Sequence, residues 1–293
     1  MKNLKEFKEL LAVQSVSYNQ VRMTDYLKSQ LNLIEGVSFY EIKENIFVEK
    51  GEGEGLKPCI VSHIDTVHSI CSDLYPLHID GNLTGFNRKT MTQTGIGGDD
   101  KVGIFICLEA LKNFDNVKVV FFSNEEVGCV GSYSTNLDFF NDCSFVLQCD
   151  RQGNNDFVVN ACGVELSSEE FQNSISKIIK SHGYQFSNGG MTDVMALKEN
   201  GLDICCANMS CGYYNPHRAE EYINIKDVEI CTKLVFDIFA NFGGVKFLHK
   251  VSKGWDEVQE MRCENCNSEV SYYKDMDDYF CNNCAMFGEE IKY

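Results

Sequence analysis

Five short segments of the chain carry histidine or carboxylate side chains where they could bind metal ions. The segments read VSHIDTV around His63, GIGGDDKVG around Asp99, SNEEVG around Glu126, LQCD ending at Asp150, and NPHRAEE around His217. Imidazole mixed with carboxylate suits Zn²⁺, Co²⁺ or Mn²⁺, whereas Mg²⁺ and Ca²⁺ prefer oxygen ligands alone. Each segment alone is compatible with a surface histidine, a helix N-cap or a solvated loop. Together they predict a metal site.

Two further acidic residues extend this site. Asp65 stands two positions after His63, where its carboxylate can orient the imidazole ring. Glu125 and Glu126 are adjacent and directly follow an apolar run. Neighbouring side chains at a strand end can point in different directions, so one glutamate could bind metal while the other acts as a general base.

The segments must be positioned by strands and helices that alternate along the chain. Strands are expected at 37–42, 45–49, 59–62, 117–122, 145–149 and 157–160, and helices at about 2–13, 19–32, 101–113, 167–182, 191–200 and 225–241. This alternation predicts an α/β fold with a central mixed, mostly parallel sheet flanked by helices. Ligands in such sheets bind at the carboxyl ends of the strands, which is where most of the candidate residues fall.

The amino-acid composition limits the classes of molecule that the protein is expected to bind. The net charge of -17 disfavours a nucleic acid or an anionic membrane as the main partner, since both require a surplus of Lys and Arg. We find no secretory signal and no apolar run long enough to span a membrane. The 15 Cys are then expected as free buried thiols or metal ligands in a cytoplasmic protein, rather than as disulfides.

Four cysteines near the end of the chain form two CxxC pairs, Cys263 with Cys266 and Cys281 with Cys284. Their separation predicts a tetrahedral structural zinc site of the zinc-ribbon type. We therefore expect a catalytic domain at 1–250 and a zinc-ribbon module at 257–293. The module is acidic, so a protein partner is a better expectation for it than a nucleic acid.

The five segments, in this order, resemble the metal-site segments of the co-catalytic di-metal peptidases, a group that includes peptidase T, aminoacylase and bacterial carboxypeptidases. The stretch GGMTDVMALKENGLDICCANMSCGYYNPH also resembles the peptidase T segment that leads to the last histidine, and the resemblance covers roughly residues 1–245. It implies two zinc ions, with Co²⁺ or Mn²⁺ as alternatives. One metal would be held by His63, Asp99 and Asp150, the other by Asp99, Glu126 and His217. Asp99 would bridge the two.

The same resemblance implies that Asp65 orients His63 and that Glu125 is the general base. The chain departs from peptidase T and its relatives in length. Those proteins insert a lid or dimerisation domain before the last histidine, whereas 66 residues separate Asp150 from His217 here. We therefore expect the lid to be absent and the architecture to be closer to the compact single-domain aminopeptidases.

Other residues must then bind the substrate. The candidates lie next to predicted ligands: Arg151, Arg218, Tyr213 and Tyr214. Either arginine could bind a substrate carboxylate, or could simply form a surface salt bridge.

The sequence thus predicts a metallohydrolase that cleaves an amide bond in a small peptide, like an amino-, di- or tripeptidase. A water shared by two cations would ionise near neutral pH, and Glu125 would accept its proton. Two alternatives stay open. One is a deacylase of N-acyl amino acids or polyamines with the same metals, and the other is a non-catalytic protein that binds partners through its zinc ribbon. The presence of both Glu125 and Asp99 favours activity.

Overall fold

The computed structural model describes residues 1–52, 55–251 and, near the C-terminus, 266, 268, 271–273, 278–281, 284 and 286–287. The chain divides into two compact units, Met1–Val251 and Ser252–Tyr293. The helices of the first unit are α1 (Leu4–Ala12), α2 (Val21–Leu31), α3 (Gly98–Asn113), α4 (Val130–Tyr133), the 3₁₀ helix η1 (Leu137–Phe140), α5 (Glu169–Ser181), α6 (Asp193–Glu199) and α7 (Ile225–Phe242).

A large sheet forms the centre of this unit, with the strand order β1-β2-β7-β3-β8-β12-β9-β10, and β11 also pairs with β9. Its strands are β1 (Val37–Ile42), β2 (Asn45–Lys50), β3 (Lys57–His63), β7 (Val117–Phe122), β8 (Cys143–Arg151), β9 (Asp156–Ala161), β10 (Val164–Glu165), β11 (Gln185–Gly189) and β12 (Cys206–Ser210). The central strands β7, β3, β8 and β12 are parallel, so their carboxyl ends meet at one edge. The neighbouring β1–β2, β2–β7, β12–β9 and β9–β10 pairings are antiparallel.

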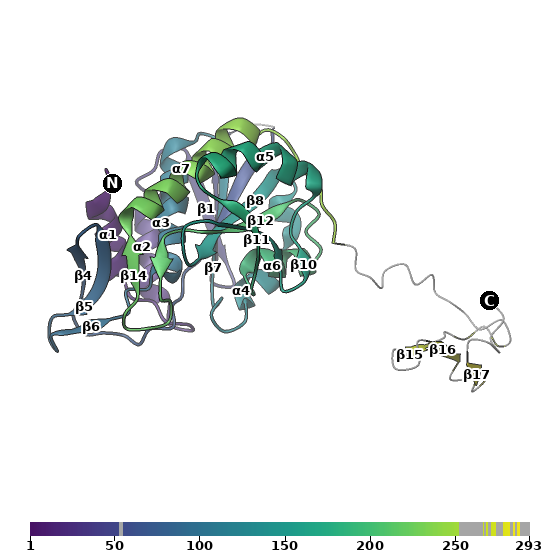
Figure 1. Cartoon of the computed structure of the whole chain (residues 1–293), viewed down its shortest axis with the longest axis horizontal. Coiled ribbons are helices and arrows are strands. Elements are labelled where there is room, and N and C mark those ends of the chain that lie inside the picture. The colour runs from purple at the N-terminus through teal and green to yellow at the C-terminus, as the bar shows by residue number, and fades with distance from the viewer. Residues whose placement is uncertain are drawn as a thin grey trace. The chain divides into compact units, whose positions relative to one another are not determined.

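Helices cover both faces of this sheet (Figure 1). Successive residues of a strand point to opposite faces, so Ile60 packs in one apolar cluster and Val61 in the other. The larger cluster holds buried residues of α1, α2, α3, α5 and α7, and the smaller one holds residues of η1 and α6. Because β3 and β7 are buried along their whole length, they are rigid supports for the residues that follow them.

A smaller antiparallel sheet has the strand order β13-β14-β5-β4, and β6 also pairs with β5. Its strands are β4 (Leu74–Ile79), β5 (Asn82–Asn87), β6 (Thr92–Thr94), β13 (Tyr213–Tyr214) and β14 (Tyr222–Asn224). β13 and β14 are neighbours in register, with Tyr214 opposite Tyr222. The intervening residues 215–221 therefore form a loop whose two ends are held together.

The predicted α/β fold with a mixed sheet between helices is confirmed. The smaller sheet was not predicted, because segments such as NLTGFN in β5 contain two Asn and a Gly, which are depleted in strands, among their few strand-forming residues. None of the helices in the described residues is long and apolar enough to cross a membrane.

The second unit contains three antiparallel strands, β15 (Ser271–Tyr273), β16 (Asp278–Cys281) and β17 (Met286–Phe287). Cys266 and Cys284 lie at turns and are partly buried. Cys263 and the side chain of Cys281 lie outside the described residues, so the zinc ribbon stays a prediction.

Candidate active site

The predicted metal ligands converge at the carboxyl edge of the central strands. His63 ends β3, Glu126 follows β7, and Asp150 is the penultimate residue of β8. Asp99 is at the start of α3, and His217 lies in the loop between β13 and β14. Residues far apart in the sequence are brought together because parallel strands end at the same edge of the sheet.

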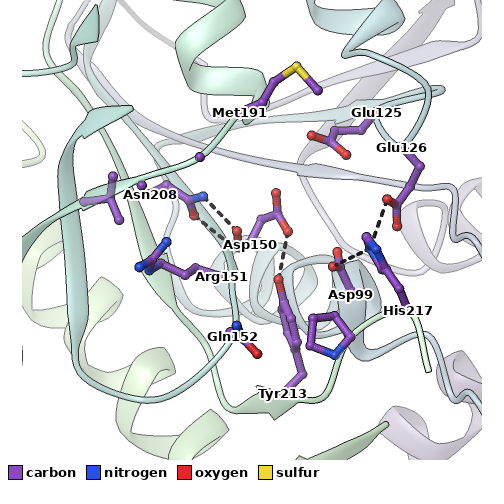
Figure 2. A pocket seen from close by; sticks show the side chains of 14 residues that line it. Asp99, Glu125, Glu126, Asp150, Arg151, Gln152, Met191, Asn208, Tyr213 and His217 are labelled. Carbon is purple, nitrogen blue, oxygen red and sulfur yellow. Dashed lines mark hydrogen bonds and ion pairs between the residues drawn. The ribbon is translucent and has the colours of Figure 1, made fainter. Parts of the chain in front are cut away.

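Asp99 lies between the two histidines. Its Oδ1 is 3.1 Å from His63 Nε2 and its Oδ2 is 3.3 Å from His217 Nε2, which Figure 2 shows for His217. His217 Nε2 is also 3.1 Å from Glu126 Oε2. The two oxygens of one carboxylate thus face two different imidazoles, an arrangement that allows a carboxylate to bridge two cations.

The glycines before Asp99 let the chain approach its neighbours closely. Gly97 has φ +69°, and a Cβ there would lie 2.9 Å from the Thr66 side chain. Asp99 is joined to Asp100 by a cis peptide bond. The close contact with Thr66 leaves no room for a side chain at Gly97, in the tight turn that presents Asp99.

His63 is buried, and its other nitrogen is already engaged. Nδ1 lies 3.0 Å from the backbone carbonyl of Asp65, to which it can donate, and 3.5 Å from an oxygen of the Asp65 carboxylate. A proton on Nδ1 leaves the Nε2 lone pair directed toward Asp99 and Asp150. Burial lowers the pKa of His63, but the carboxylates of Asp150, Asp65 and Asp99 outweigh burial and raise it well above its usual value.

The carboxylate of Asp65 has a contact that was not expected. It accepts hydrogen bonds from the backbone N–H groups of Glu125, at 3.0 Å, and Glu126, at 3.3 Å, and from the Ser17 hydroxyl at 2.7 Å. The nearest contact of Asp65 with the His63 ring is made by its main-chain oxygen instead. Asp65 therefore orients the ring mainly through its backbone, while its side chain fixes the loop that carries both glutamates.

Glu125 and Glu126 differ in surroundings. Burial raises the pKa of Glu125 to about 9, and the charges of Asp150 and Asp193 act in the same direction against the opposing His63. Burial raises the pKa of Glu126 to about 7, with Asp99 adding to the shift and His63 opposing it. The Oε1 atom of Glu126 is buried and has no hydrogen-bond partner among the described residues. A buried oxygen in that position fits a metal ligand, since a cation would supply the missing partner.

Asp150 is held by polar contacts from several sides. The Tyr213 hydroxyl donates to its Oδ1 at 3.2 Å, and Gln148 Nε2 donates to its Oδ2 at 3.3 Å. Gln148 also donates to the buried carboxylate of Asp193 at 3.0 Å. Asn208 fixes the main chain of Asp150 through bonds of 2.9 and 2.7 Å. Burial raises the pKa of Asp150 to about 7, and the charge of Asp99 reinforces the shift.

By distance alone, two sets of three side chains could hold a metal ion. One set is His63, Asp99 and Glu126, and the other is His63, Asp100 and Asp150. The oxygens of Asp100 are already used: Oδ2 accepts from the Ser62 hydroxyl at 2.5 Å, and Oδ1 accepts from the Gly103 N–H at 3.1 Å. Asp100 is therefore better suited to hold the loop than to bind a cation.

A cavity of about 460 Å³ opens beside these residues. In addition to the ligands and Glu125, residues along its wall are Arg151, Gln152, Val158, Met191, Asn208 and Tyr213 (Figure 2). The side chain of Arg151 is anchored by Asp156, through Nε at 2.8 Å and Nη2 at 2.7 Å. Two of the four residues considered for substrate binding, Arg151 and Tyr213, thus line the cavity.

The structure does not bring Tyr214 and Arg218 to this cavity. The Tyr214 hydroxyl donates to Asp227 at 2.7 Å, and its ring stacks on Tyr222. Arg218 is exposed on the loop that carries His217. A position next to a proposed ligand in the sequence did not predict which residues line the cavity, because adjacent side chains point in different directions.

The fold and the site define a metallopeptidase. The family model of the M42 glutamyl aminopeptidases matches residues 87–234, half of the chain, and the chain belongs to this family. M42 peptidases require metal ions, and the chain is accordingly a metal-dependent enzyme that hydrolyses peptides. No curated protein sequence matches the chain.

Several solved structures share this fold. Aminopeptidase PepT from Bacillus cereus ATCC 10987 is 16% identical with a TM-score of 0.64, and the match covers 80% of this chain and 96% of that chain. A tripeptidase from Staphylococcus aureus subsp. aureus Mu50 is 15% identical with a TM-score of 0.66, covering 82% and 97%. Aminopeptidase APDkam598 from the archaeon Desulfurococcus kamchatkensis is 15% identical with a TM-score of 0.61, covering 83% and 94%. At these identities the likeness establishes the fold.

Proposed function

We propose that the chain is a two-metal peptidase for short peptides, in which His63, Asp99 and Asp150 hold one cation and Asp99, Glu126 and His217 hold the other. The placement of Asp99 between two histidine nitrogens is the observation that supports this most strongly. Two bound cations would lower the pKa of a shared water and polarise the scissile carbonyl. Zinc suits the mixed ligands, and Co²⁺ or Mn²⁺ are alternatives.

Glu125 is the proposed general base. It lines the cavity beside the proposed ligands and lies 3.9 Å from His63 Nε2, with the Cys129 thiol as a donor to its Oε1 at 3.4 Å. In the absence of cations the pKa of Glu125 is raised to about 9, chiefly by burial. Positive charge at the neighbouring ligands would lower it toward neutrality, where a base accepts and returns protons most effectively. Glu125 would take a proton from the attacking water and deliver it to the departing amine.

We further propose that the described residues between Asp150 and His217 include no lid over this cavity, so that residues of the main unit bind the substrate. Asp150 and His217 are separated by β9, β10, α5, β11, α6, β12 and β13, of which β13 belongs to the smaller sheet and the other strands to the central sheet. Arg151 is the residue proposed to bind a substrate carboxylate, because it lines the cavity and Asp156 fixes its guanidinium.

The cytoplasmic location is part of the same proposal. The cysteines of residues 1–251 that the structure describes are all unpaired, and most are buried. The Cys231 thiol donates a hydrogen bond to Cys149 Sγ at 3.7 Å, and the two cysteines are not joined by a disulfide. Unpaired thiols in such numbers suit a reducing compartment.

A substrate screen combined with metal analysis tests the proposed function. Purified protein, loaded with Zn²⁺, Co²⁺ or Mn²⁺, is assayed on dipeptides, tripeptides, longer peptides and N-acyl amino acids. We expect short free peptides to be cleaved and about two metal equivalents to be bound by the first unit, plus about one in the ribbon. Preferential cleavage of N-acyl amino acids would identify a deacylase instead. A single equivalent that disappears when the residues after 251 are removed would refute the two-metal site.

A further inference from the structure

Glu221 is a buried carboxylate close to the proposed metal ligands but absent from the wall of the cavity. It is 0% exposed and lies at the end of the loop that carries His217. Its neighbour Glu220 is exposed. A fully buried carboxylate is costly unless hydrogen bonds or opposite charges compensate for the lost hydration, so its contacts are informative.

The Glu221 carboxylate is bound to the backbone on both sides of the tight turn that presents Asp99. Its Oε2 accepts a hydrogen bond from the Gly97 N–H at 2.7 Å. Its Oε1 accepts one from the Asp99 N–H at 3.1 Å. One oxygen of Glu221 therefore holds the main chain of Asp99, whose own two oxygens face the two histidines, and the other oxygen holds Gly97 two residues earlier.

His68 completes this arrangement from a third segment of the chain. Its Nε2 lies 2.8 Å from Glu221 Oε2, and its side chain is 17% exposed. Its ring packs directly on Gly95, where a Cβ would lie 2.0 Å from the ring. The absence of a side chain at Gly95 is what allows His68 to reach Glu221.

These contacts join three loops that carry proposed ligands. The loop after His63 supplies His68, the loop of residues 95–99 ends at Asp99, and the loop after His217 supplies Glu221. Lys101 lies nearby, buried, with its ammonium group donating to the carbonyls of Leu11 and Ile96. Glu221 is thus the point at which the supports of three ligands meet.

We propose that Glu221 is a positioning residue of the metal centre: it holds the Asp99 backbone so that the Asp99 carboxylate can reach both cations, and His68 holds Glu221 in place. This inference rests on the proposed two-metal function. Neither residue lines the cavity, so neither is expected to contact the substrate. Groups that hold metal ligands in this way commonly change metal affinity or activity by about 10–100-fold when they are replaced.

The test compares Glu221→Gln with Glu220→Gln, the same change at the exposed neighbour. Zinc affinity is measured on folded, metal-stripped protein by competition with a chromogenic chelator, and the melting temperature of the metal-free protein is recorded alongside. We expect Glu221→Gln to weaken zinc binding by about 10–100-fold. We expect Glu220→Gln to bind zinc as the wild type does. Turnover of Glu221→Gln should recover partly at high zinc, because all direct ligands are still present.

Equal zinc affinity of Glu221→Gln and wild type would overturn the positioning role. A lower melting temperature with unchanged zinc affinity would also overturn it, since that result describes a merely structural residue. If Glu221→Gln does not fold, His68→Gln provides the same measurement, with weaker zinc binding expected and unchanged binding refuting the inference. Wild-type protein that binds no zinc beyond the ribbon equivalent would refute the two-metal function itself, which is a different outcome.

Discussion

The carboxylate of Asp65 accepts a hydrogen bond from the backbone N–H of Glu125 at 3.0 Å. The strand end that supplies His63 is thereby tied to the loop that supplies the proposed base. The bond is buried, so water does not compete for it, and the position of the Glu125 main chain is well defined.

Replacing Glu125 by Gln should leave metal content nearly intact while lowering turnover by about 10²–10⁴-fold, because the amide keeps the shape of the side chain but cannot accept the proton of water. Metal analysis and kcat for a cleaved dipeptide measure the two effects. The exposed Glu165 is a matched control, and Glu165→Gln should retain wild-type values. Turnover by Glu125→Gln close to that of the wild type would show that another group is the base.

His217→Ala should reduce the zinc bound by the whole chain from about three equivalents to about two, because His63, Asp99 and Asp150 would still be present for the other cation and the ribbon equivalent would remain. The His217 side chain is 50% exposed, so its removal should have little effect on folding. His78→Ala provides the control, since His78 is exposed on the smaller sheet. Retention of about three equivalents by His217→Ala would contradict its assignment as a ligand.

Arg151→Ala should raise KM for peptides with a free C-terminal carboxylate more than for the same peptides with a C-terminal amide. A charge-assisted hydrogen bond contributes roughly 1.5–3 kcal/mol, which corresponds to an increase in KM of about ten-fold or more. Asp156→Ala is an informative partner variant, because it keeps the guanidinium but removes its anchor. An equal effect on acid and amide substrates would exclude carboxylate recognition by Arg151.

The metal-free protein should be less stable at pH 8 than at pH 6. Asp99 is the main cause that raises the pKa of His217 to about 9, above its usual 6.5. The stabilisation from protonated His217 is complete below the unfolded pKa and is lost as the pH rises through the folded pKa. Glu126, whose pKa is raised to about 7 chiefly by burial, acts in the same direction because ionising it in the folded protein is unfavourable. Thermal unfolding in excess chelator measures this difference.

Added zinc should reduce or reverse this pH dependence. Metal binding requires deprotonated ligands, so zinc stabilises the protein more at pH 8 than at pH 6. A metal-free protein with the same melting temperature at both pH values would show that these shifts do not govern its stability.

Phe145→Ala should destabilise the fold without changing zinc affinity. Phe145 is fully buried in β8 and its ring contacts those of Phe171, Phe239 and Phe247. Large-to-small changes of this kind cost about 3–5 kcal/mol of unfolding free energy. Chemical denaturation and the chelator competition assay measure the two quantities. A large loss of zinc affinity would mean that the core and the site are energetically coupled.

The fold, and the strand ends at which proposed ligands lie, could be predicted from the sequence because they depend on local patterns. His63, Glu126 and Asp150 stand at or just after apolar strand segments, and the alternation of strands with helices indicates a parallel centre. The side-chain contacts that hold these residues in place could not be predicted from the sequence. Ser17 and Asp65, or Glu221 and Asp99, meet through tertiary packing, and no local pattern distinguishes buried Glu221 from exposed Glu220.

The position of His217 in the chain has a consequence for biosynthesis. The other proposed ligands are complete once β8 has been synthesised, whereas His217 and Glu221 come from the last loop before α7. A nascent chain that has emerged only as far as β8 contains all three proposed ligands of the first cation, but it lacks the histidine of the second set and the glutamate that supports Asp99. Acquisition of the second cation should therefore follow the release of this loop from the ribosome, and early exposure to zinc during translation should not yield a fully loaded enzyme.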